Sequence, residues 1–486
     1  MSSKTAATVI FFAVFTTLLV AIHLPYLTLP FFWDELGQFV PAALDILRHD
    51  AWIPISTLPN VHPPAVMAYL AAVWKIFGYS IPATRVAMLL IASAGLLFSF
   101  LLAIRLARGT VGAPAFAVAA LMVATPIFYT QAMMAQLDMP AMTLTVLALL
   151  LFLDEQYASC TLACTALVLV KETGLSTPLV FGGWLLYERR WPQAGFFAAP
   201  LIALSVWLLL LHHATGNWLG NSEFARYNLA DSLQLGHVVA TLFRRAYFLF
   251  VANGLFLGSI ALFAGSRVLK GREWRIAFLV AGAQVLTVTL LGGAALDRYL
   301  LPVLPILYAA MAAAASVYPA SWRWTTQTAM VAILAIGFFW NPPYPFPFED
   351  NLAMTDFIDL QQQAAVYLEE HAPGKRIASV WPFTDAIERP EFGYVRRPLL
   401  VERAEDFGLA NLADIDRRKM DVLVVFSQVW GFGGGVMDYE FVQNYLRRYW
   451  GYRPQATAEE IRAGIGFVPV LRWTRGGQWI EIYLPE

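Results

Sequence analysis

Long apolar runs recur through the first two thirds of this chain, and they constrain its fold more than any other feature. A run of about 20 apolar residues is long enough to cross the hydrocarbon core of a bilayer as a helix. Scanning the 486 residues for such runs predicts about eleven transmembrane helices. The predicted spans are residues 6–29, 86–107, 111–130, 139–153, 158–170, 175–188, 194–212, 238–264, 276–294, 299–317 and 326–340.

The composition agrees with a polytopic membrane protein. Hydrophobic residues make up 58% of the chain and charged residues 14%, whereas soluble domains carry about 25% charged residues. The net charge of −1, without a basic tail, gives no sign of a nucleic-acid partner. The first apolar run, Ala6–Leu29, lacks a small-residue cleavage site before the acidic segment that follows. We therefore expect it to be retained as a transmembrane helix.

The basic residues predict the orientation of the spans. If Lys4 is cytoplasmic, strict alternation places every basic cluster between the spans on the cytoplasmic side, as the positive-inside rule requires. These clusters are Arg105 and Arg108, Arg189 and Arg190, Arg267 to Arg275, and Arg323.

The opposite side receives carboxylates together with scattered cations. A transporter is expected to bury charges near the bilayer midplane, whereas the predicted spans here are almost free of ionisable groups in their middle parts. We therefore expect the chemistry at the outer boundary between water and lipid. The external polar residues are Asp34, Glu35, His62, Gln136, Asp138, Lys171, Glu172, Asp297, Arg298 and Tyr299.

The character of the chain changes after Trp340. Residues 341–349 are rich in proline and predict a stiff linker. Residues 350–486 are more charged and predict an extracytoplasmic α/β domain. A helix is expected at Thr355–His371, and strands at Ile377–Trp381, Pro398–Val401, Asp421–Ser427, Phe467–Thr474 and Gln478–Leu484, the last two forming a hairpin.

Residues 5–340 resemble a known family through a series of motifs on the external side. The motifs are Trp33-Asp34-Glu35, His62-Pro63-Pro64, Gln136-Leu137-Asp138, Lys171-Glu172-Thr173-Gly174 and Asp297-Arg298-Tyr299. In order and sidedness they resemble the GT-C fold glycosyltransferases that use polyprenyl-phosphate sugars. The series is most similar to bacterial relatives of the protein O-mannosyltransferases and of the lipid A aminoarabinose transferase.

The resemblance implies a role for each matching residue. Asp34 falls on the family's catalytic base, Glu35 completes the acidic pair, and Asp138 falls on the second acidic residue of the active site. Lys171 and Arg298 fall on the cations that contact the lipid phosphate. His62 stands where the family often has a basic residue before the double proline, and it is expected to help Lys171 and Arg298 hold the donor phosphate. The domain at residues 350–486 is not explained by the resemblance.

The resemblance also implies the partners and the location. The donor is a polyprenyl-phosphate sugar, and the acceptor is a protein, lipid A or a glycan outside the cytoplasm. No cofactor is required. From the residues alone, a divalent metal held by His212 and His213 with Glu35 or Glu172 is an alternative, although no spacing demands it. The protein is expected in a bacterial inner membrane, with its N-terminus in the cytoplasm and its C-terminal domain in the periplasm or outside the cell.

The residue types suit this chemistry. A carboxylate can accept the proton of an attacking hydroxyl or amine. A lipid-phosphate leaving group develops charge that fixed cations stabilise, and lysine and arginine are the usual donors to phosphate.

Other interpretations remain open at this stage. Asp34 also fits a solvated loop, and Asp138 also fits a helix cap. Lys171 and Glu172 also fit a mutual ion pair, and Arg298 beside Tyr299 also fits an interfacial anchor. At the level of the whole protein, the alternatives are a transporter or flippase for a lipid-linked or small polar substrate, and a binding component anchored by its helices.

Overall fold

The computed structural model describes residues 3–226, 232–340, 349–428, 439–450 and 453–486. The chain forms two compact units. The first comprises Met1–Leu27 and Val40–Phe338, and the second comprises Thr28–Phe39 and Phe339–Glu486. The segment that carries Asp34 and Glu35 therefore folds with the C-terminal unit. Of the predicted proline-rich linker, residues 341–349, all but Glu349 lies outside the described residues.

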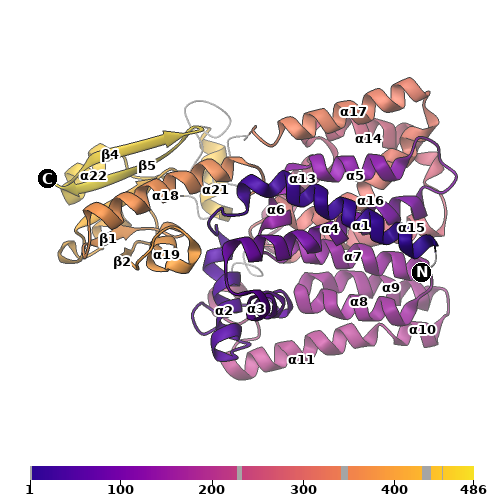
Figure 1. Cartoon of the computed structure of the whole chain (residues 1–486), viewed down its shortest axis with the longest axis horizontal. Helices are drawn as coiled ribbons and strands as arrows, with labels where there is room; N and C mark the ends of the chain where they lie inside the picture. The colour runs from indigo at the N-terminus through magenta and orange to yellow at the C-terminus, as the bar shows by residue number, and fades with distance from the viewer. Residues whose placement is uncertain (1–2, 227–231, 341–348, 429–438, 451–452) are drawn as a thin grey trace. The chain divides into compact units, whose positions relative to one another are not determined.

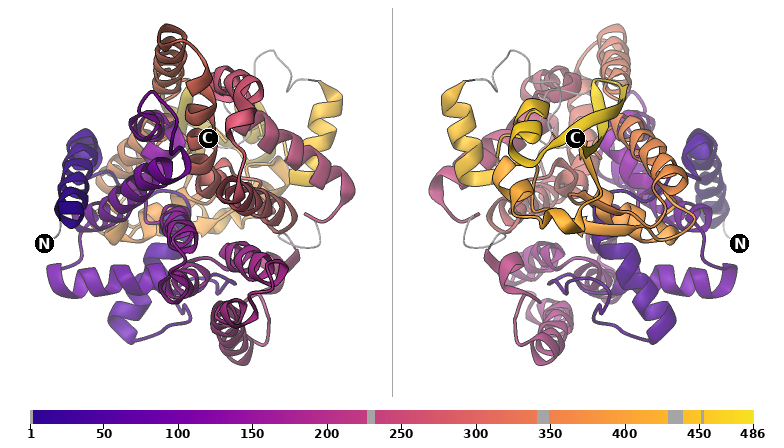
Figure 2. Two further views of the ribbon diagram at one scale, coloured as in Figure 1. Left: turned by 90° about the vertical axis from the view of Figure 1, so that its right-hand side faces the viewer. Right: turned by 90° about the vertical axis from the view of Figure 1, so that its left-hand side faces the viewer.

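The first unit consists of helices, and its long helices run side by side (Figure 1). Figure 2, left, shows many of them end-on, whereas α2 and α3 lie across them. The helices are α1 (Ser3–His23), α2 (Val40–His49), α3 (Ala65–Phe77), α4 (Ile81–Leu106), α5 (Pro114–Ala124), α6 (Pro126–Met133), α7 (Asp138–Leu153), α8 (Tyr157–Val170), α9 (Ser176–Tyr187), α10 (Trp191–Gly195), α11 (Ala198–Thr215), α12 (Ser222–Ala225), α13 (Leu235–Phe250), α14 (Leu255–Gly265), α15 (Arg272–Leu291), α16 (Leu304–Ala314) and α17 (Ala320–Ile336).

The prediction of about eleven membrane spans is not confirmed. Among the described residues, five helices are long and apolar enough to cross a bilayer, or seven if each of two bent pairs counts as one span. The bent pairs are α5 with α6, at 70°, and α13 with the helical turns Ala252–Val268, at 43°. The helices α3, α7 and α8 are apolar but shorter. Proline explains the break between α5 and α6, because Pro126 cannot donate the hydrogen bond that would continue α5.

Large apolar side chains cover the outside of the helical unit. Phe263 on α14 is 88% exposed, Phe243 on α13 is 79% exposed and Ile10 on α1 is 62% exposed. A soluble protein rarely leaves so many large apolar groups in water. These side chains form the lipid-facing surface of a multi-pass membrane protein.

Ion pairs join several helices at one end of the unit. They link the ends of α4, α7 and α9 with the starts of α8 and α15, so these five termini lie on one side. Arg105, Arg190 and Arg272, which the alternation of spans assigns to one side, lie among these termini. The pairs are Arg105–Asp154 (3.0 Å), Arg105–Glu273, Arg190–Glu155 (3.0 Å) and Arg272–Glu188 (2.7 Å).

The second unit is an α/β fold, as the sequence predicts. Its sheet has the strand order β2-β1-β3-β5-β4. Strand β1 pairs in parallel with β2 and β3, and β5 pairs antiparallel with β3 and β4. All five predicted strands are confirmed: β1 (Arg376–Ser379), β2 (Leu400–Arg403), β3 (Val422–Phe426), β4 (Phe467–Arg475) and β5 (Gln478–Pro485).

Local sequence explains the parts of this sheet. The strand β3 reads Val-Leu-Val-Val-Phe and is buried along its whole length, which suits the centre of a sheet covered on both faces. Gly476 and Gly477, between β4 and β5, have φ values of +54° and +81°. Two left-handed residues make the tight turn that suits a two-residue hairpin. The helix α18 (Ala353–His371) packs on the sheet, with Phe357 5.4 Å from Phe426 between ring centroids.

Candidate active site at one end of the helical unit

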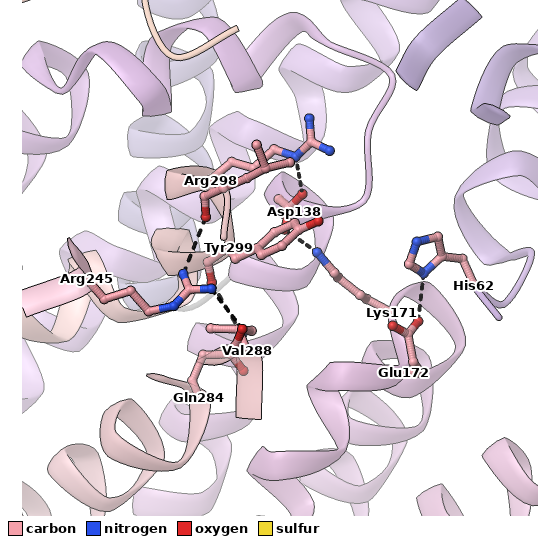
Figure 3. A network of polar contacts seen from close by, with 10 residues as sticks. His62, Asp138, Lys171, Glu172, Arg245, Gln284, Val288, Arg298 and Tyr299 are labelled. Atoms are coloured by element: carbon pink, nitrogen blue, oxygen red, sulfur yellow. Dashed lines mark hydrogen bonds and ion pairs between the residues drawn. The ribbon is translucent and has the colours of Figure 1, made fainter. Parts of the chain in front are cut away.

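Three of the predicted residues form one buried cluster in the first unit (Figure 3). Both oxygens of the Asp138 carboxylate are engaged. Lys171 Nζ donates to Oδ1 at 2.5 Å, and Arg298 Nε lies 3.1 Å from Oδ2. The three side chains are only 4–8% exposed. Ion pairs with this little access to water are screened weakly and depend on one another.

The fold explains why these three residues meet. Asp138 is the first residue of α7, Lys171 directly follows α8, and Arg298 lies in the helical turn η7 (Asp297–Val303) after α15. Each of these positions is at the end opposite the ion-paired termini of the same helices. The Asp138 carboxylate in the first turn of α7 also faces the positive end of the helix dipole.

Tyr299 lies beside the two cations. Lys171 Nζ is 4.1 Å from the centroid of the Tyr299 ring, and the Arg298 guanidinium carbon is 5.8 Å from it. The backbone of Tyr299 is held in turn, because Gln284 Nε2 donates to its carbonyl at 3.4 Å and Ser176 Oγ donates to Gln284 Oε1 at 3.1 Å. The ring and the cations thus share a site that α9 and α15 support.

Arg245 is a further cation that the sequence reasoning missed. Its side chain is fully buried, and its guanidinium donates to the Val288 carbonyl at 2.8 Å and to the Leu296 carbonyl at 3.4 Å. These bonds bracket the turn between α15 and η7, as Figure 3 shows. Arg244 and Arg245 lie within the first third of the predicted span 238–264. Two adjacent arginines in an apolar run were the signal, since such residues are costly in lipid.

His62 and Glu172 form a second pair near this cluster. His62 Nδ1 lies 2.8 Å from Glu172 Oε2. The pair connects the segment before α3 with the turn after α8, next to Lys171. The interpretation of Lys171 and Glu172 as a mutual ion pair is therefore wrong, because each binds a different partner.

The surroundings of Glu172 lower the pKa of its carboxyl group. Burial acts to raise the pKa of the Glu172 carboxyl, but the charge of His62, its hydrogen bond and the charge of Lys171 together bring this pKa below its ordinary value of 4.5. A carboxyl whose pKa is lowered by folding adds stability above its ordinary pKa, and this stability is lost as the pH falls through the lowered value.

The pair therefore predicts a pH-dependent effect of Glu172→Gln. At about pH 6 the variant is expected to melt below the wild type. The difference should shrink as the pH falls through the lowered pKa of Glu172, because the wild type then loses the charge that the variant lacks. Thermal melting in detergent at several pH values measures this. The exposed Glu223 on α12 provides the control Glu223→Gln, which should melt like the wild type throughout. A difference for Glu172→Gln that stays constant with pH would contradict the assignment.

Asp34 and Glu35 lie in the second unit, in the segment Thr28–Phe39. The Glu35 carboxylate is buried and accepts the Phe32 amide at 3.0 Å, so it shapes the turn around Asp34. Two unusual backbone features flank Asp34. Trp33 has a φ of +54°, and Glu35–Phe39 forms a π-helical turn. A left-handed bulky residue is strained, and both features are found preferentially at functional sites.

The structure thus separates the six predicted residues into three groups. Asp138, Lys171 and Arg298 meet in one cluster, His62 binds Glu172, and Asp34 with Glu35 belongs to the other unit. The interpretation of Arg298 as an interfacial anchor was wrong, because its side chain is 4% exposed. No group of three or more potential metal ligands occurs among the described residues.

The helical unit with its polar end, together with the α/β unit, has the GT-C fold that the sequence resemblance predicts. No protein-family profile matches the chain, and no curated protein is significantly similar to it. Two solved structures of ArnT from Cupriavidus metallidurans are similar to it over nearly its whole length. The structure bound to undecaprenyl phosphate has a TM-score of 0.57 at 14% identity and covers 97% of each chain.

The second ArnT structure is in the apo state and has a TM-score of 0.56 at 13% identity, covering 99% of this chain and 98% of that chain. The archaeal oligosaccharyltransferase AglB from Archaeoglobus fulgidus, in complex with an inhibitory peptide and a dolichol-phosphate, has a TM-score of 0.48 at 12% identity. It covers 87% of this chain and 70% of its own. At these identities the likeness to ArnT defines the fold.

Proposed function

We propose that this protein is a membrane glycosyltransferase that moves a sugar from a polyprenyl-phosphate carrier to an acceptor outside the cytoplasm. One observation carries the proposal: Lys171 and Arg298 converge on Asp138 at one end of the helical unit. The likeness of fold to an ArnT structure bound to undecaprenyl phosphate supports it.

The cluster supplies what a lipid-phosphate leaving group needs. When the bond between the sugar and the phosphate breaks, negative charge grows on the phosphate oxygens. Lys171 and Arg298 are the proposed donors to these oxygens, because fixed cations in a water-poor site stabilise developing charge without reorganising. Lysine provides a compact charge, and the guanidinium provides a fork that matches phosphate. Asp138 holds both cations in place and is the proposed contact to the sugar or the acceptor.

Asp34 is the proposed general base. The acceptor oxygen or nitrogen forms a bond to the anomeric carbon, the bond from that carbon to the phosphate oxygen breaks, and the proton of the acceptor passes to Asp34. A single displacement of this kind inverts the anomeric configuration. Glu35 is proposed to shape the turn that presents Asp34, and His62 to fix Glu172 beside Lys171.

The same proposal covers the location and the partners. We place the protein in a bacterial inner membrane, with the N-terminus in the cytoplasm and the C-terminal unit in the periplasm. The acceptor is a protein, lipid A or a glycan. No resident metal or other cofactor is part of the proposed mechanism.

A transfer assay tests the function. Purified protein is incubated with a panel of polyprenyl-phosphate sugars and candidate acceptors, and the release of polyprenyl phosphate is followed together with the glycosylated product. Release that depends on one donor and one acceptor is expected. Absence of release with every donor in the panel, under conditions where the donors bind, would overturn the proposal.

Lys171→Ala is expected to raise the donor KM and, because the phosphate gains negative charge as its bond breaks, to lower kcat as well. The variant removes one of two proposed phosphate contacts, so the donor KM should rise by about 10-fold or more, as the loss of a charge-assisted hydrogen bond implies. Steady-state kinetics with varied donor measures this. Lys75 on α3 is exposed, and Lys75→Ala serves as the control that removes a lysine without removing a phosphate contact. An unchanged donor KM in Lys171→Ala would contradict the role.

A flippase for a lipid-linked substrate is the second candidate, and Arg244 with Arg245 favours it because they lie within a predicted span. Charges of this kind mark polar paths through membranes. One observation argues against a flippase. The Arg245 guanidinium already donates to two backbone carbonyls, so its hydrogen bonds do not depend on a passing substrate. Reconstituted vesicles distinguish the two functions. A flippase moves the intact sugar lipid across the bilayer, whereas a transferase breaks its phosphate bond.

A further inference from the structure

Three consecutive aromatic residues precede Asp34, and each packs on a different ring of the C-terminal part of the second unit. Phe31 lies 6.5 Å from Phe392, Phe32 lies 6.0 Å from Phe357, and Trp33 lies 4.4 Å from Trp381, between ring centroids. The three partner rings come from η9 (Pro390–Phe392), from α18 and from the residues that follow β1. Aromatic pairs at these separations are attractive beyond their burial.

The backbone of Phe31 is held at both of its polar groups. Its amide donates to the Phe392 carbonyl at 3.1 Å, and its carbonyl accepts the Tyr394 hydroxyl at 3.0 Å. Phe31, Phe392 and Tyr394 are buried. Buried hydrogen bonds of this kind fix the backbone, because opening them would leave polar groups without partners. The turn three residues before Asp34 is therefore fixed by the C-terminal chain.

Close packing continues on the other side of Asp34. A Cβ atom added to Gly37 would lie 3.0 Å from Trp381 Nε1 and 3.2 Å from Trp381 Cζ2. The π-helical turn at Gly37 therefore lies so close to the Trp381 indole that any larger residue at position 37 would have to displace the ring. Between these two contacts, Trp33 is kept at a φ of +54°, and such strain persists only where the surroundings impose it.

We propose that the C-terminal α/β unit positions the catalytic base of this enzyme, with Tyr394 and Trp381 as positioning residues that act through Phe31–Gly37. The proposal rests on the proposed function of Asp34. It gives residues 350–486 a task in the transfer step itself. Neither Tyr394 nor Trp381 is required to touch the donor or the acceptor. Their loss should therefore reduce turnover and leave the binding of the donor phosphate unchanged.

Tyr394→Phe is the primary test, because it removes one hydroxyl and keeps the ring. Hydrogen exchange of the segment Thr28–Phe39 in the full-length protein should become about fivefold faster, the factor that the net free energy of one hydrogen bond represents. In the transfer assay kcat should fall by a similar factor while the donor KM stays the same. The control is Tyr483→Phe, which loses the hydroxyl bond of a buried tyrosine to Glu481 in the same unit.

Gly37→Ala is the second variant and acts from the other side of Asp34. The added methyl group must displace the Trp381 indole by a few tenths of an ångström, so the same pair of effects is expected without loss of any hydrogen bond. Gly183→Ala on α9 is the matched control, because a Cβ atom there would meet nothing within 4 Å.

The outcomes separate this inference from the proposed function. Faster exchange of Thr28–Phe39 with lower kcat, in both variants and in neither control, supports the positioning role. Unchanged exchange in Tyr394→Phe overturns it, and so does faster exchange with unchanged kcat. Equal losses of kcat in Tyr394→Phe and Tyr483→Phe also overturn it, since they indicate general destabilisation. If the wild type transfers no sugar, the proposed function fails, whereas the exchange experiment still reports whether Tyr394 holds the segment.

Discussion

Asp34→Asn is expected to lower the rate of sugar transfer by about 10²- to 10⁴-fold, the range that positioned proton acceptors contribute. Asparagine keeps the shape of aspartate and loses its basicity, so the acceptor would attack while still carrying its proton. The anchored turn around residue 34 should keep its structure, because Phe31, Glu35 and Gly37 form the contacts that define it. Rapid-mixing or steady-state assays at saturating donor measure the effect.

Two measurements serve as controls for this prediction. The donor affinity of Asp34→Asn should equal that of the wild type, since the change removes no proposed phosphate contact, and a cooperative melting transition should show that the variant is folded. Asp50, exposed after α2 with a φ of +51°, offers the matched control Asp50→Asn, because asparagine tolerates left-handed backbone. Near-normal turnover in Asp34→Asn would refute the role of Asp34 as the base.

Asp138→Asn is expected to destabilise the helical unit by about 3–5 kcal/mol, the cost of removing one partner from a buried ion pair. Lys171 and Arg298 approach the same carboxylate and are 8% and 4% exposed. Without the negative charge, two cations would face each other with little water to screen them. Thermal or chemical unfolding in detergent measures the loss.

A double variant tests the physical reason. Asp138→Asn combined with Lys171→Met removes one cation as well, and should recover part of the stability lost in Asp138→Asn alone. The exposed pair Glu155–Arg190 provides the contrast, because Glu155 is 52% exposed. Glu155→Gln should cost at most about 1 kcal/mol, as exposed ion pairs do. Equal costs for Asp138→Asn and Glu155→Gln would show that Asp138 does not act as a buried counterion.

Local sequence patterns allowed correct prediction of the sheet and the first long helix of the second unit. All five strands, the helix α18 and the closing hairpin could be predicted, because alternation, β-branched runs and the Gly476-Gly477 turn are local signals. Apolar runs likewise marked most of the longer helices of the first unit. They did not reveal how long each helix is, since a hydropathy run continues through a proline break such as the one at Pro126.

The meeting of Asp138, Lys171 and Arg298 could be anticipated from sidedness and from the family resemblance. The sequence could not show which of these residues pair, because pairing depends on the distances between side chains at three helix ends. The two features missed by sequence reasoning are long-range. Arg245 binds carbonyls more than 40 residues away, and Phe31–Trp33 contact rings more than 300 residues away. Only the folded chain shows that the three aromatic residues hold the acidic turn against the C-terminal part of the second unit.

The shortness of α7 and α8 has a consequence for the membrane itself. These helices have 16 and 14 residues, or about 24 Å and 21 Å at 1.5 Å per residue, against a hydrocarbon thickness of about 30 Å. In a bilayer of that thickness, helices of this length whose ion-paired ends lie at one surface would hold Asp138 and Lys171 below the other surface. Hydrophobic mismatch of this size thins the surrounding lipid or draws headgroups inward. The free energy of bringing an anionic lipid head group to this depth therefore depends on the thickness of the bilayer.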